Sequence, residues 1–95
     1  MEKIHYDIII TGSIQNIGFS FQIMKMADEM GICGFATYLN NDNLRIEAEG
    51  DKDVLNKFID KCKTGIPEAS ITKLSVEQSL LQNYNGFTIT NNTNN

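Results

Sequence analysis

The stretch Ile8-Ile9-Ile10-Thr11-Gly12-Ser13-Ile14-Gln15-Asn16-Ile17-Gly18-Phe19-Ser20 decides how this chain folds. An apolar run meets a glycine, crosses a short polar turn, meets a second glycine and takes up helical spacing from Phe19, which is typical of a strand followed by a helix. The first backbone N–H groups of such a helix have no intrahelical acceptors. With the positive end of the helix dipole behind them, they form an anion site. The same spacing also fits a plain strand-to-helix connection, and both interpretations stay open at this point.

Composition excludes several classes of protein. The chain has 95 residues, of which 41% are hydrophobic, and this suits one domain with one core. The formal net charge is −4 and the eight Lys and Arg residues are scattered, which argues against a nucleic-acid partner. No stretch approaches the roughly 18 apolar residues of a membrane span, and no apolar signal segment precedes the first strand. We therefore expect a cytoplasmic protein without a membrane or metal site, in which Cys33 and Cys62 are unpaired apolar fillers.

Hydrophobic periodicity predicts the elements. Strands are expected over residues 4–11, 34–39, 44–49, 71–76 (78 at most) and 87–90, and helices over 19–30 and between Asp51 and Gly65. The first strand places its even-numbered isoleucines on one face and His5 on the other, where we expect this histidine to point at solvent. The third strand likewise turns Arg45, Glu47 and Glu49 outward, which predicts one buried and one wet face. The second helix should bury a stripe that contains Val54, Phe58, Ile59 and Cys62.

The resulting order is β-α-β-β-α-β with a short terminal strand. Two helices on one face of an antiparallel sheet make an α+β sandwich of the ferredoxin-like type. We expect a single domain over residues 1–90, followed by a disordered polar tail over residues 91–95. This fold hosts many unrelated activities, so it does not by itself indicate a chemistry.

Four segments of the chain resemble the acylphosphatase family. The family signature G-x-V-Q-G-V-G-F-R stands here as Gly12-Ser13-Ile14-Gln15-Asn16-Ile17-Gly18-Phe19-Ser20. Its second signature, G-W-V-x-N-x-x-D-G-x-V-E, stands as Gly34-Phe35-Ala36-Thr37-Tyr38-Leu39-Asn40-Asn41-Asp42-Asn43-Leu44-Arg45. The A-E-G before the second helix and the closing G-F reappear as Ala48-Glu49-Gly50 and Gly86-Phe87. The resemblance covers residues 4–90, in order and with matching element lengths.

The resemblance implies a reaction and a site. Family members hydrolyse the carboxylic–phosphoric anhydride of acyl phosphates without a metal or organic cofactor. The loop amides and an arginine at the end of the loop hold the phosphate, and an asparagine on the second strand orients the attacking water. Carried over, the phosphate-binding loop here is Gln15, Asn16, Ile17, Gly18, Phe19 and Ser20. Ser20 stands at the arginine position and Tyr38 at the asparagine position, so the residues expected to act on the substrate are both replaced.

These replacements leave three hypotheses. In the first, hydrolysis of acyl phosphates is absent or at least hundreds-fold impaired, because losing one partner of a desolvated charge pair costs roughly 2–5 kcal/mol and each ~1.4 kcal/mol is tenfold in rate. In the second, the chain is an active but divergent acylphosphatase, and in the third it is a module that binds a small anion or a protein. Neither Lys25 nor Arg45 is expected to reach the loop and replace the missing charge. We expect a monomer, and self-association through the short last strand is a weaker alternative.

Overall fold

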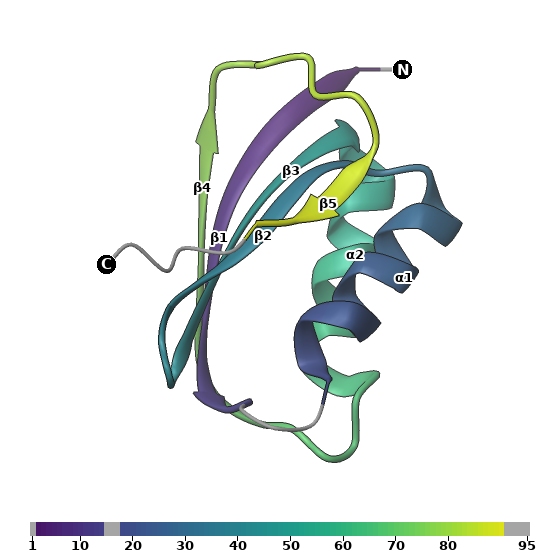
Figure 1. The fold of residues 1–95 in the computed structure, drawn as a ribbon. Helices are drawn as coiled ribbons and strands as arrows, with labels where there is room; N and C mark the ends of the chain where they lie inside the picture. The colour runs from purple at the N-terminus through teal and green to yellow at the C-terminus, as the bar shows by residue number, and fades with distance from the viewer. Residues whose placement is uncertain (1, 15–17, 91–95) are drawn as a thin grey trace.

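The computed structural model describes residues 2–14 and 18–90, which form two layers, a sheet and a pair of helices packed on one of its faces (Figure 1). The predicted loop residues Gln15, Asn16 and Ile17 and the predicted tail lie outside the described residues. The elements follow in the order β1 (Lys3–Ser13), α1 (Phe19–Met30), β2 (Cys33–Asn40), β3 (Asn43–Asp51), α2 (Lys52–Thr64), β4 (Ser70–Ser79) and β5 (Phe87–Ile89). Among the described residues, neither helix is long and apolar enough to cross a membrane. The predicted ferredoxin-like α+β architecture is confirmed.

The sheet has the strand order β4-β1-β3-β2-β5. Four of the strands pair antiparallel, as predicted, and β5 pairs parallel to β2 through Gly34↔Phe87, so the complete sheet is mixed. β4 is longer than its apolar alternation indicated, because it pairs with β1 from His5↔Ser79 to Ser13↔Ser70. Its polar ends therefore join the ladder through backbone hydrogen bonds that hydrophobic periodicity does not report.

The core lies between the sheet and the helices. It consists of the inward residues of β1 and β3 and one face of each helix, with Ile8, Ile10, Leu44, Ile46, Phe19, Ile23 and Phe58 all fully buried. The buried face of α2 begins at Leu55, which is fully buried, and not at the predicted Val54, which is half-buried. Leu55 shares one helix face with Phe58, Ile59 and Cys62 at the spacing i, i+3, i+4, i+7.

The ends of both helices follow from local chemistry. Gly31 ends α1 in the left-handed region, at φ 72°, and its N–H and that of Ile32 bond back to the last turn. Asp51 caps α2 by accepting a hydrogen bond from the Asp53 N–H at 3.2 Å, as its position predicted. Gly12 in β1 is required by close approach, since a Cβ there would lie 2.0 Å from the carbonyl oxygen of Ser70. This glycine lets the end of β1 pack directly against the start of β4.

Candidate functional site

The connection from β1 leads into the first turn of α1, whose backbone N–H groups have no acceptor within the helix. Ile14 is fully buried and fixes the beginning of the connection. At its end Gly18 has φ 66° and ψ 30°, and no side chain of the described residues caps the helix there. The carbonyl of Gly18 accepts the N–H of Gln22 at 3.0 Å, which is the first α-helical bond. The N–H groups of residues 19–21 precede that bond and therefore have no intrahelical acceptor.

The glycine at position 18 is needed for its backbone conformation. A Cβ at Gly18 would meet no atom within 4 Å, so space does not exclude a side chain there. The left-handed conformation does, because it costs other residues roughly 1–2 kcal/mol. Gly18 thus sets the angle at which α1 leaves the loop and the direction in which its first N–H groups point.

Ser20 and Tyr38 both lie at this end of the molecule. Ser20 is in the first turn of α1 and is buried, with 8% of its surface exposed. Tyr38 is near the end of β2 on the helix side of the sheet, where it pairs with Leu44. Its hydroxyl donates to the carbonyl oxygen of Ile14 at 3.4 Å. The tyrosine therefore reaches from the sheet to the beginning of the loop.

The structure gives a place to each of the two cations considered from the sequence. The Arg45 guanidinium lies on the sheet face away from the helices, where it donates to the Asp7 carboxylate at 3.2 and 3.0 Å. It also pairs with Glu47 at 2.9 Å. The hydrogen bond to Asp7 raises the pKa of Arg45 despite partial burial. Lys25 is exposed on α1, in the turn after the one that holds Ser20.

His5 corrects the prediction that this residue points at solvent. The histidine is only 2% exposed, and its Nδ1 lies 2.7 Å from an oxygen of Glu49, which is fully buried. Its Nε2 lies 3.3 Å from Glu47. The reason is that the segment between β4 and β5 crosses this face of the sheet, bringing the Tyr84 ring within 5.9 Å of the His5 ring. The expectation that Glu49 is wet was wrong for the same reason.

The crossing segment, residues 80–86, is held by one carboxylate. The N–H groups of Gln82 and Tyr84 both donate to Glu49, at 2.5 and 3.1 Å. Asn83 between them has φ 59°, and a left-handed residue between two such N–H groups forms a small anion-binding nest. Burial alone would raise the pKa of Glu49, but hydrogen bonds from Gln82, His5 and Tyr84 outweigh it and the pKa is lowered. Burial and a hydrogen bond to Glu47 raise the pKa of Tyr84 to about 12.

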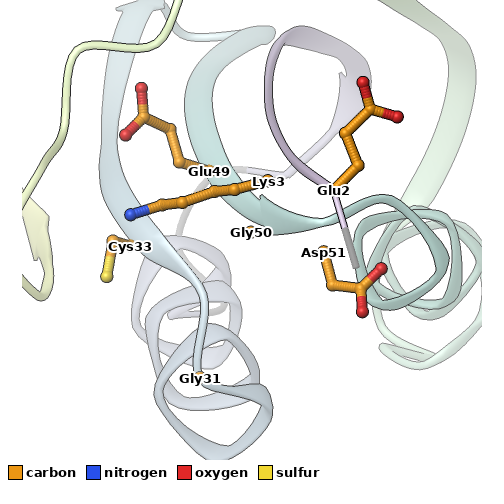
Figure 2. Close-up of a pocket in the computed structure, with 7 residues that line it drawn as sticks. All are labelled: Glu2, Lys3, Gly31, Cys33, Glu49, Gly50 and Asp51. Atoms are coloured by element: carbon orange, nitrogen blue, oxygen red, sulfur yellow. The ribbon is translucent and has the colours of Figure 1, made fainter.

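A pocket of about 280 Å³ opens at the end of the sheet where β1 and β2 begin and β3 ends (Figure 2). Its lining comprises Glu2, Lys3, Gly31, Cys33, Glu49, Gly50 and Asp51. Figure 2 shows the Lys3 side chain extending toward the β2 side, where Cys33 lies, while Glu2 and Asp51 point the other way. Within the described residues, no group of three His, Cys, Asp or Glu side chains is placed to hold a metal ion. The acidic lining does not suit an anion, so the loop remains the candidate site for one.

Comparison with known proteins assigns the family. The acylphosphatase family model matches residues 6–89. The chain belongs to the acylphosphatase family. An acylphosphatase of Ligilactobacillus salivarius is 34% identical over 87 residues, covering 90% of this chain and 97% of the relative. One of Thermotoga maritima is 32% identical over 82 residues, covering 86% and 91%.

A solved structure of a relative has the same fold as this acylphosphatase family member. The crystal structure of acylphosphatase from Bacillus subtilis superposes with a TM-score of 0.87 at 30% identity, covering 92% of this chain and 98% of that one. The family match includes both the loop before α1 and the strand that carries Tyr38. Both Ser20 and Tyr38 lie within the residues that the family model matches.

Proposed function

We propose that this acylphosphatase family member binds phosphate, or the phosphate group of a small acyl phosphate, at the loop Gln15–Ser20 and hydrolyses acyl phosphates at least hundreds-fold more slowly than its active relatives. The observation that carries the proposal is the reach of Tyr38 to the carbonyl of Ile14. A phenol fixed at the beginning of the loop stands where the family signature has a small amide that orients water. Its one O–H donor is directed at the Ile14 carbonyl and leaves only acceptor lone pairs on the oxygen, whereas an asparagine amide offers two donors and an acceptor together.

The phosphate side of the proposal rests on main-chain groups. The free N–H groups at the start of α1 and the positive end of the helix dipole favour a tetrahedral anion. Ser20 adds at most one neutral hydroxyl, without the charge or the planar fork of an arginine. Stabilisation of the charge that spreads over the transferring phosphoryl oxygens is the main task in such reactions. We therefore infer that this chain still binds phosphate although its hydrolysis of acyl phosphates is strongly reduced.

Thermal unfolding with phosphate tests the binding part. A ligand at ten times its dissociation constant adds about 1.4 kcal/mol of stability, which raises the Tm of a domain of this size by roughly 5–10 °C. Phosphate and sulfate should raise the Tm, and sodium chloride at matched ionic strength should not. Gly18→Asn, which keeps a residue tolerant of φ near 66°, serves as a control that retains the response. A Tm that is equal in phosphate and chloride would remove the anion site from the account.

The proposal also includes the setting of the protein. Free thiols at Cys33 and Cys62 are compatible with a reducing, cytoplasmic compartment. The net charge of −4 agrees with a small-molecule ligand in place of a nucleic acid.

A further inference from the structure

One edge of the sheet is long and open. β4 is the terminal strand in the order β4-β1-β3-β2-β5, and it pairs only with β1 among the described residues (Figure 1). It spans ten residues, eight of them exposed and two half-buried. The opposite edge, β5, spans three residues. A strand edge of this length presents a row of unpaired backbone N–H and C=O groups to another strand.

From Lys73 to Glu77 the side chains of β4 alternate between polar and apolar. Lys73, Ser75 and Glu77 share the sheet face of Thr11 and Asp7, to which the first and last of them are paired. Leu74 and Val76 lie on the helix side, and 39% of the Val76 surface is exposed. Lysine on an edge strand normally discourages pairing. Here the strand carries its own counter-charge four residues away on the same face.

We propose that two copies of this chain associate weakly through antiparallel pairing of their β4 strands, with the two-fold axis at Ser75. In this register Lys73 of each copy faces Glu77 of the other, which gives two ion pairs per dimer. Leu74 of each copy faces Val76 of the other on the helix side. Opposite charges and apolar pairs directly across an antiparallel ladder both stabilise it. The inference is independent of the function proposed above.

A hollow beside the edge fits the same register. It has a volume of about 280 Å³ and is lined by Lys63, Ile71, Thr72, Lys73 and Leu74. Pairing about Ser75 brings Val76 of the second copy to the Leu74 end of this hollow. A shift by two residues in either direction would set Lys73 or Glu77 opposite serine, and a shift by one would move the apolar side chains to the wrong face. Charge and apolar pattern therefore select one register.

A cysteine cross-link tests the register. In a Cys33→Ser background, oxidation of Ser75→Cys should give a covalent dimer, because the two β-carbons would be roughly 4.5–5.5 Å apart. Ser79→Cys is the matched control on the same face of the same strand. Its two copies would be roughly 26 Å apart at about 3.3 Å per residue, so it should stay monomeric. Equal cross-linking of the two variants, or none in either, would overturn the proposal.

Charge reversal tests the association itself. Sedimentation equilibrium of the unmodified chain from low micromolar to millimolar concentration should show a monomer that becomes a dimer. Lys73→Glu alone and Glu77→Lys alone should each weaken dimerisation about tenfold, because each creates two like-charge pairs. The double variant should restore it, and Lys25→Glu on α1 should leave it unchanged apart from a small net-charge effect. A monomer at all concentrations, or no rescue by the double swap, would contradict the inference.

Discussion

Removal of the Glu49 carboxylate should detach the segment 80–86 from the sheet. The carboxylate is fully buried and accepts hydrogen bonds from the Gln82 N–H, the Tyr84 N–H and the His5 ring. Glu49→Ala leaves three donors without an acceptor, and an unsatisfied buried donor costs roughly 1–3 kcal/mol. Gln82 is exposed, so water can replace part of the loss at that position. We therefore take the lower end for each donor and expect a decrease of about 3 kcal/mol in the free energy of unfolding.

Urea unfolding followed by circular dichroism measures this loss. For a domain of this size, about 3 kcal/mol corresponds to a midpoint lowered by roughly 1.5–2 M. Glu29→Ala, an exposed glutamate on α1, removes the same group away from the cluster and should change stability by less than about 0.5 kcal/mol. Hydrogen exchange should show that Gln82 and Tyr84 amides lose protection in Glu49→Ala. If Glu49→Ala and Glu29→Ala have the same midpoint, the reasoning about this buried carboxylate is refuted.

Three further outcomes follow from the same geometry. Because the pKa of Glu49 in the folded chain lies below its usual 4.5, its stabilising contribution is present above that pH and is lost as the pH falls through the folded pKa. In Glu49→Gln the free energy of unfolding should therefore decrease less steeply at acid pH than in the unaltered chain. Gly18→Val should lower the free energy of unfolding by roughly 1–3 kcal/mol and abolish the rise of Tm with phosphate. Gly18→Asn should keep the stability and the phosphate response nearly intact. Equal behaviour of the two variants would rule out the conformational role of φ 66°. Burial raises the pKa of the Cys62 thiol to about 12. Mass spectrometry after iodoacetamide treatment at mildly alkaline pH should therefore find Cys33 modified and Cys62 intact. Early modification of Cys62 would contradict its burial.

The sequence predicts the helix side of this molecule better than the opposite side. Alternation in residues 4–11 and 44–49 and the helical spacing after Phe19 all report burial against one core, and this suffices for the α+β architecture. Gly18 and Gly31 mark the ends of α1 because their left-handed conformations exclude most other residues. Local sequence patterns therefore predict the fold and the two ends of α1.

The sheet face away from the helices could not be predicted in the same way. The burial of His5 and Glu49 depends on residues 80–86, a polar segment without periodicity whose path over the sheet is set by two N–H groups that bond one carboxylate. One signal was present, since His5 and Glu49 are direct cross-strand partners in the register that the two strands require. The contact of Tyr38 with Ile14 is likewise tertiary, because it joins residues 24 positions apart.

Hydrolysis of benzoyl phosphate measures whether this chain has lost the activity of its relatives. The chain and the Bacillus subtilis acylphosphatase would be assayed side by side, together with Ser20→Arg/Tyr38→Asn, which introduces the arginine and asparagine that the resemblance to the family signature implies. We expect the chain to be at least hundreds-fold slower than the relative. The double variant should gain activity over the chain, and either single variant should gain less. Turnover by the unaltered chain at the rate of the relative would contradict the account.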